Sequence, residues 1–228
     1  MSALFAMLVR KPEPGKVKPG LADCLGEPGA AKFYRSCVMD LCERFAQLSV
    51  PMRVLMYSPR GARKSVGLMA SRHWRLAQQE GSGRGAALAG AFEYAWRMGC
   101  QRAVVLLSDC PTVPGAFIID AFDRLLVDDV VLGPTTDGGV YLVGLSMERP
   151  ELFMGLDWDG DAAFDALVGR VDAFGLVLGL APHWYDVEDR AGLDRLASHL
   201  RALALVGDEG LPRRTQTLLQ RLRLAKGE

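Results

Sequence analysis

An aspartate that directly follows an apolar run is the best-placed residue for chemistry in this sequence. Asp109 comes after 103–107, within the segment Ser108-Asp109-Cys110-Pro111. Packing gives no good reason for a carboxylate at the end of a central strand. Binding of a hard divalent ion does, because such ions bind one or two carboxylates together with substrate phosphates. The alternative is a cap for the helix predicted from Pro114, but Asp109 lies several residues too early for that role.

A lysine-rich loop follows the first apolar run, residues 3–9. It reads Lys11-Pro12-Glu13-Pro14-Gly15-Lys16-Val17-Lys18. The prolines stiffen this loop and Gly15 permits a tight turn. The ammonium groups of Lys11, Lys16 and Lys18 suit a phosphate, which needs compact positive charge. A solvated basic loop explains the same residues equally well.

Two later segments are open to two interpretations each. Gly133-Pro134-Thr135-Thr136-Asp137-Gly138-Gly139 contains a strong hairpin signal, but its paired glycines would also let a ligand approach the backbone closely. His183-Trp184-Tyr185-Asp186-Val187-Glu188-Asp189 could be aromatic packing with Asp189 as a helix cap. Asp186 could instead be a second metal ligand that meets Asp109.

These segments belong to a chain in which apolar strands alternate with helices. That pattern is typical of an α/β protein with a mostly parallel sheet covered on both faces. Ligands bind beyond the carboxyl ends of the strands in such sheets, so the segments above should meet there. The predicted strands are 3–9, 53–57, 103–107, 129–132, 140–143 and 176–180; the predicted helices are 28–48, 86–98, 114–126, 161–174 and 190–203, and 66–79 suggests a short helix and a weak strand.

Composition excludes several classes of protein. The chain has 228 residues, of which 50% are hydrophobic and 24% charged, as in a globular protein with a sizeable core. Its 27 basic and 27 acidic residues balance, which argues against a nucleic-acid partner. Residues 1–100 nevertheless carry a net charge of +8 and residues 101–228 one of −8. The five cysteines form no Cys-x-x-Cys pair and no apolar run reaches the ~20 residues of a membrane span, so we expect a reduced, cytoplasmic protein.

We expect one domain over residues 1–207 and a basic helical tail over 208–228, packed on that domain or extending from it. The tail carries an apolar stripe of Leu211, Leu218, Leu219 and Leu222. Such a stripe could join two copies in a homodimer or pack on its own subunit, and we prefer the second reading.

Five ordered segments of the chain resemble a known family. They are the Lys11–Lys18 loop, Ala30-Ala31-x-x-Tyr34, Asp109-x-Pro111, the run Gly133-Pro134-x-x-Asp137-Gly138-Gly139-x-Tyr141-Leu142-x-Gly144, and Trp184-Tyr185-Asp186-Val187. Together they are similar to the bacterial DUF2064 family of nucleotide-diphospho-sugar transferase-like proteins. More distantly, they resemble the nucleotidyltransferases that make molybdopterin dinucleotide or guanylyl-phospholactate.

The resemblance implies a three-layer α/β/α, Rossmann-like GT-A fold and a site for each ligand. Lys11, Gly15, Lys16 and Lys18 would hold the phosphates of a nucleotide or nucleotide-sugar donor. Asp109 and Asp186 would bind Mg²⁺ or Mn²⁺, and Asp109 and Asp137 would be catalytic. The pocket for the sugar or a small-molecule acceptor would be lined by Gly138, Gly139 and Tyr141.

The chain departs from the family pattern on the phosphate side. The family has Thr-Arg-Leu after the last lysine, where this chain has Pro19-Gly20-Leu21. The family's Gly-Asp-Leu-Gly-x-Arg aligns with Gly81-Ser82-Gly83-Arg84-Gly85-Ala86, in which Arg84 partly replaces the lost arginine. Ser108 stands where the family has glycine, and Trp158-Asp159-Gly160-Asp161 replaces a Trp-Ser/Thr segment.

Three functions from different classes follow. The first is a metal-dependent glycosyl- or nucleotidyltransferase, favoured by Asp109 and the lysine loop. The second is a degenerate, non-catalytic nucleotide-binding member of the same fold, favoured by the lost arginine and acid. The third, least favoured, is a nicotinamide-dependent enzyme that uses the loop 81–85, against which the absence of a clear preceding strand argues.

Overall fold

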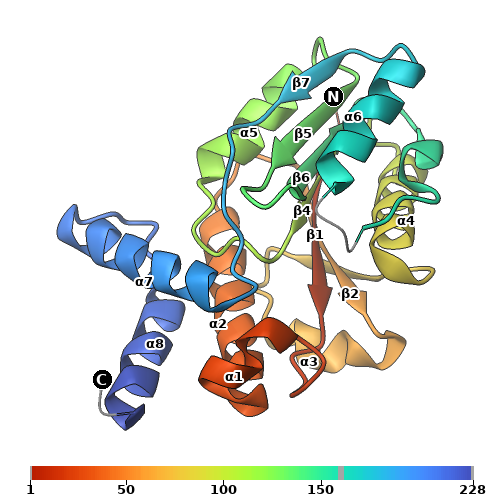
Figure 1. Ribbon diagram of the computed structural model, residues 1–228. Helices are drawn as coiled ribbons and strands as arrows, with labels where there is room; N and C mark the ends of the chain where they lie inside the picture. Colours follow the sequence, from red (N-terminus) through yellow and green to blue (C-terminus); the bar gives the residue numbers. More distant parts are fainter. Residues whose placement is uncertain (1, 159–161, 227–228) are drawn as a thin grey trace.

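Seven strands form one central sheet, in the order β3-β2-β1-β4-β6-β5-β7 (Figure 1). The computed structural model describes residues 2–158 and 162–226. Within that part of the chain, β6 runs antiparallel to β4 and β5, and the other neighbouring strands are parallel. The strands are β1 (Ala3–Arg10), β2 (Met52–Ser58), β3 (Arg75–Gln78), β4 (Arg102–Leu107), β5 (Val130–Pro134), β6 (Val140–Leu145) and β7 (Leu178–Leu180).

Helices cover both faces of this sheet, so the predicted fold class is confirmed (Figure 1). They bury apolar stripes because a two-sided sheet offers two hydrophobic surfaces. The α-helices are α1 (Ala22–Leu25), α2 (Glu27–Phe45), α3 (Arg63–Gly67), α4 (Gly83–Arg97), α5 (Gly115–Arg124), α6 (Ala163–Ala173), α7 (Arg190–Leu205) and α8 (Arg213–Lys226); the 3-10 helices are η1 (Pro19–Leu21), η2 (Arg60–Ala62) and η3 (Pro150–Phe153).

Strand β1 shows how the alternation of side chains divides the core into two layers. Phe5 and Met7 point into a cluster with residues of α2 and α5, whereas Leu4 and Ala6 point into one with residues of α4 and α6. All four side chains are fully buried. Strand β1 is therefore covered on both sides, which leaves its end and the loop beyond it as the exposed part that can carry function.

One sequence interpretation needs correction. Strand β3 pairs with β2 and ends shortly before the loop 81–85, so a strand does precede this glycine-rich loop. It was hard to recognise because it is a short edge strand whose outermost residues, Arg75 and Gln78, are polar and exposed. Gly85 nevertheless serves packing, since a Cβ there would lie 2.5 Å from the carbonyl oxygen of Phe153. Of the Trp158–Asp161 segment, residues 159–161 lie outside the described residues.

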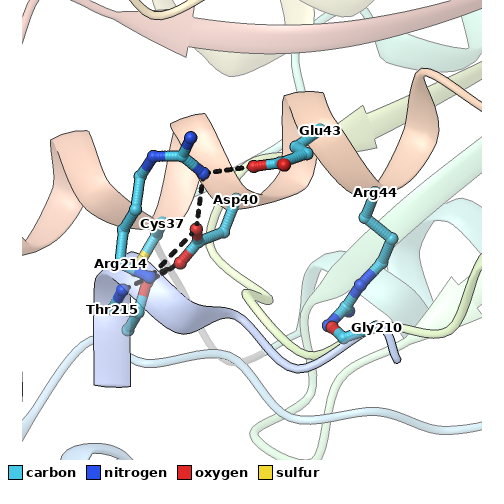
Figure 2. Close-up of polar contacts among 7 residues, drawn as sticks. All are labelled: Cys37, Asp40, Glu43, Arg44, Gly210, Arg214 and Thr215. Carbon is cyan, nitrogen blue, oxygen red and sulfur yellow. Dashed lines mark hydrogen bonds and ion pairs between the residues drawn. The ribbon is translucent and has the colours of Figure 1, made fainter. Parts of the chain in front are cut away.

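Helix α8 packs along α2, and a buried carboxylate joins them (Figure 2). Asp40 of α2 accepts hydrogen bonds of 2.8 Å from both the backbone nitrogen and the hydroxyl of Thr215, and its side chain is 5% exposed. Arg214 bonds to Asp40 at 3.2 Å and also pairs with the exposed Glu43. Leu219 of the apolar stripe is buried against α7 and α2 residues, so this stripe faces its own subunit. None of the described helices combines the length and hydropathy needed to cross a bilayer.

We predict that Asp40→Ala lowers the free energy of unfolding by about 2 kcal/mol, because it leaves buried donors of Thr215 without an acceptor. Urea denaturation measures this loss. The matched control, Glu43→Ala, removes an exposed partner of the same arginine and should cost under about 1 kcal/mol. Equal losses for the two variants would contradict the role given to Asp40.

Candidate functional site

The candidate site lies at the carboxyl ends of the central strands, where three chain segments meet. Asp109 follows β4, and the hairpin turn 135–139 joins β5 to β6. The segment around Trp184 runs beside the end of β5, with a 3.1 Å hydrogen bond from its nitrogen to the carbonyl of Pro134. It then crosses to β4, where the nitrogen of Val187 donates to the carbonyl of Asp109 at 3.0 Å. This path brings Asp186 and Asp109 to the lining of one cavity, and their joint role as metal ligands stays a prediction.

Together these segments enclose a polar cavity of about 180 Å³. Of the predicted site residues, Asp109, Asp137, Gly139, Tyr141 and Asp186 line it. The cavity therefore gathers carboxylates from three distant parts of the sequence. The remaining lining residues are Arg84, Leu107, Cys110, Thr135, Val140, Trp158 and Glu188.

Lys18 joins the lysine loop to these carboxylates. Its ammonium nitrogen lies 2.5 Å from Oδ1 of Asp109 and 2.8 Å from Oε1 of Glu188, and its side chain is only 3% exposed. Burial opposes a charged lysine, but the two carboxylates outweigh that cost and raise its pKa above the ordinary value. Burial likewise opposes the charge of Asp109, yet Lys18 keeps its pKa below the usual range. The pair is therefore ionised at neutral pH.

None of the four predicted phosphate-binding residues is among those that line the cavity: Lys18 contacts two lining carboxylates, and Lys11, Gly15 and Lys16 lie elsewhere in the loop. Lys11 pairs with Glu13 within the loop, and Lys16 is exposed. Gly15 has φ of +71°, a conformation that glycine adopts without the steric cost paid by other residues. Their assignment to donor phosphates stays a prediction.

The backbone around Lys18 is closed against the segment that carries Glu188. A Cβ on Gly20 would lie 2.4 Å from the carbonyl oxygen of Glu188. Gly20 stands where the family pattern has an arginine. The structure shows a reason for the glycine, because the Glu188 backbone occupies the space that a side chain at this position would need. Lys18 itself has φ of +51°, which is unfavourable for a residue with a Cβ. The ion pairs of its side chain stabilise this conformation.

The hairpin turn is both a turn and a wall of the cavity. Oδ1 of Asp137 accepts hydrogen bonds from the hydroxyl of Thr135 and, at 3.2 Å, from the nitrogen of Gly139. Gly138 has φ of +91° and is not among the lining residues. The hydroxyl of Tyr141 donates to the carbonyl of Pro182 at 2.9 Å. Asp137 and Tyr141 therefore line the cavity from positions that the hairpin holds.

Several expectations about other residues are settled here. Asp109 does not cap α5, whose N-cap residue is Pro114, whereas Asp189 does cap α7 by accepting from the nitrogen of Gly192 at 2.8 Å. Cys110 is fully buried, and burial raises the pKa of its thiol, as befits a core residue. Ser108 donates to or accepts from the hydroxyl of Tyr34 at 3.0 Å.

Sequence reasoning missed Glu188 and Trp158 and underrated Arg84. Glu188 is one of three acids in the run 186–189, so only the fold distinguishes it from the neighbouring helix cap. Arg84 is exposed on the cavity wall, donates to the carbonyl of Trp158 at 3.1 Å, and contributes to the low pKa of Asp109. The positive charge of Arg84 within the glycine-rich loop 81–85 is the feature of the sequence that could have identified it.

The carboxylates fit a divalent ion held by few protein ligands. Burial and the charge of Asp137 raise the pKa of Asp186 to about 6, so negative charge is in excess on this side of the cavity. A cation would relieve that excess. Among the described residues, however, no three acidic, histidine or cysteine side chains are grouped to hold an ion. Such a site would therefore take Asp109 and Asp186 together with substrate phosphates, which is a usual arrangement for Mg²⁺.

We predict that Asp186→Asn raises the melting temperature at pH 7.5. Because the folded pKa of about 6 exceeds the ordinary 3.8, ionisation of Asp186 destabilises the fold as pH rises through that interval, and the whole cost is present above pH 6. Asparagine removes it, so the gain should shrink towards pH 4. The exposed Asp172→Asn variant is the control and should show no comparable pH-dependent gain. An Asp186→Asn protein that melts no higher than wild type at pH 7.5 would refute this account.

Several solved structures are similar to this chain in fold. The "putative nucleotide-diphospho-sugar transferase" of Desulfovibrio desulfuricans G20 superposes with a TM-score of 0.84 at 29% identity, over 97% of this chain and 95% of that one. The 4-diphosphocytidyl-2C-methyl-D-erythritol synthase of Anaerococcus prevotii DSM 20548 has a TM-score of 0.60 at 9% identity, over 88% and 96%. Glucosyl-3-phosphoglycerate synthase of Mycobacterium tuberculosis, in complex with Mn²⁺, UDP and glucosyl-3-phosphoglycerate, has a TM-score of 0.52 at 12% identity, over 89% and 79%. The last two likenesses concern the fold.

A family model covers the centre of the chain. No curated protein matches at a significant level. The model described as "Uncharacterized protein conserved in bacteria (DUF2064)" matches residues 41–160, a range that includes Asp109 and Asp137 and excludes Lys18 and Asp186. Because that match spans more than half of the 228 residues, the chain belongs to the DUF2064 family.

Proposed function

We propose that this protein is a metal-dependent transferase that moves a glycosyl or nucleotidyl group from a nucleotide donor to a small acceptor. The observation that carries the proposal is the gathering of Asp109, Asp137, Asp186 and Arg84 around one cavity at the carboxyl edge of the sheet. Open α/β sheets bind their ligands at that edge. The similar structures include a nucleotide-diphospho-sugar transferase-like protein and a synthase that holds Mn²⁺ and UDP.

The donor's phosphates would lie between the carboxylates and Arg84. Asp109 and Asp186 would hold Mg²⁺ or Mn²⁺, which supplies positive charge that stabilises the leaving phosphate. Arg84 offers a guanidinium, which can bind phosphate oxygens in a bidentate manner. It would thereby supply part of the positive charge that this chain lacks because the two family arginines are missing. Lys11 and Lys16 would steer the donor towards the cavity from the neighbouring loop.

The acceptor would bind on the hairpin side of the cavity. Gly139 presents backbone there, and the Asp137 carboxylate lies in the same wall with Oδ1 already fixed by the turn. A carboxylate held in this way can orient an acceptor hydroxyl without a large entropic cost at the moment of reaction. Gly138 and Tyr141 would shape this pocket rather than donate to the acceptor, because the Tyr141 hydroxyl already donates to Pro182.

A non-catalytic nucleotide-binding role is the second candidate, and one observation favours it. The backbone of Glu188 lies so close to Gly20 that the family arginine would not fit without movement. A protein that binds a donor but lacks part of its phosphate-binding machinery could bind without turnover. Release of product by the wild type, lost in Asp109→Asn, would remove this candidate.

We predict that a nucleotide or nucleotide sugar raises the melting temperature only when Mn²⁺ is present. A ligand at a hundred times its dissociation constant stabilises the folded state by about 2.7 kcal/mol, which is a shift of several degrees for a chain of this size. A thermal-shift panel of donors, with and without Mn²⁺, measures it.

Two variants complete this panel. Asp109→Asn should lose the Mn²⁺-dependent shift because it removes a proposed metal ligand. Asp120→Asn, which alters an exposed carboxylate paired with Arg124, should keep it. The proposal fails if no donor stabilises the wild type, or if Asp109→Asn responds as the wild type does.

A further inference from the structure

The ammonium group of Lys18 occupies a position where a cation would be expected. It bridges Asp109 and Glu188, both of which line the cavity, at 2.5 and 2.8 Å. A divalent ion at Asp109 would need at least one oxygen of the same carboxylate. An ammonium and a metal ion so close together repel each other strongly in a buried site.

Two features indicate that the side chain of Lys18 is needed here, and a third shows that the backbone is closed around it. Its φ of +51° is one that glycine would adopt at lower cost. Its side chain is almost completely buried, although an uncompensated lysine is rarely found in that state. Gly20 permits the backbone of Glu188 to close over the loop, with a distance of 2.4 Å from its virtual Cβ to the Glu188 carbonyl oxygen. The local structure thus keeps a positive charge against Asp109.

We propose that Lys18 and a divalent cation compete for the carboxylate of Asp109, so that Lys18 must leave Asp109 before the ion can bind there. The protein alone would then bind the ion weakly. Donor phosphates would favour the exchange, because they offer new partners to the ammonium group and further ligands to the ion. This competition would couple metal binding to donor binding. The biological role given to this competition rests on the proposed function. The Mn²⁺-binding test does not, because it uses no nucleotide.

The test measures Mn²⁺ binding to the protein without any nucleotide, by the loss of the free-ion electron paramagnetic resonance signal. Lys18→Gln removes the charge while keeping a hydrogen-bond donor beside the carboxylates. It should bind Mn²⁺ at least about tenfold more tightly than wild type, because one like charge is removed from close to the ion. Lys18→Arg retains the charge and should bind as weakly as wild type. Lys64→Gln removes an exposed lysine on α3 and should leave the affinity unchanged.

A second measurement, the melting temperature with and without Mn²⁺, keeps the test valid if the variants are less stable. Removal of the Lys18 charge takes away the ion-pair partner of Asp109 and Glu188, so Lys18→Gln should melt below wild type, and Mn²⁺ should restore more of its melting temperature than it adds to wild type. An unchanged or lower Mn²⁺ affinity in Lys18→Gln, or equal tightening in Lys18→Arg, would overturn the proposal. Donor binding in the thermal-shift panel with no effect of Lys18→Gln on Mn²⁺ would leave the transferase function standing while this inference falls. Tighter Mn²⁺ binding by Lys18→Gln, with no donor stabilising the wild type, would support this inference and remove the transferase function.

Discussion

A buried ammonium group between two carboxylates is the interaction on which the candidate site depends. Lys18 comes from the loop after β1, Asp109 from the end of β4, and Glu188 from the segment before α7. A buried charge is costly unless it is paired, so the three segments are held together by the same pairing that makes each charge tolerable. The shape of the cavity follows from it, because Asp186 and Glu188 reach the cavity only if their segment stays against the end of β4.

The sheet makes this convergence possible. Strand β1 lies next to β4, so the loops that leave their carboxyl ends are neighbours although about 90 residues separate Lys18 from Asp109. Strands β5 and β6 pair in antiparallel fashion, which turns the hairpin 135–139 towards the same edge. Two apolar layers immobilise the strands from either side. The site can therefore hold several charges in fixed positions, since the loops that carry them are anchored at the ends of rigid strands.

The sequence predicts the fold well because buried strands and amphipathic helices have strong periodic patterns. It also raises a meeting of Asp109 and Asp186 as one of two readings of the segment 183–189, without deciding between them. The edge strand β3 is hard to predict from the sequence because it is short and lacks the continuous apolar run that marks the buried strands. The partner of Lys18 escapes it too: a lysine in a basic loop suggests a phosphate, and only the fold shows that the nearest negative charges belong to the protein itself. Glu188 lies beside a helix cap of the same charge, so no local pattern separates their roles.

The opposite net charges of the two halves of the chain agree with the residues found at the candidate site. The positive first half supplies Lys18, which contacts two of the cavity's carboxylates, and Arg84, which lines the cavity; the negative second half supplies the carboxylates. We propose that this cavity receives a divalent ion together with donor phosphates while Lys18 leaves Asp109. A crystal soaked with Mn²⁺ and a nucleoside diphosphate tests this proposal through the anomalous difference map. We expect a manganese peak between Asp109 and Asp186, with Lys18 moved from Asp109 onto a phosphate. A nucleotide bound at another face, or a peak that leaves the Lys18–Asp109 contact intact, would contradict it.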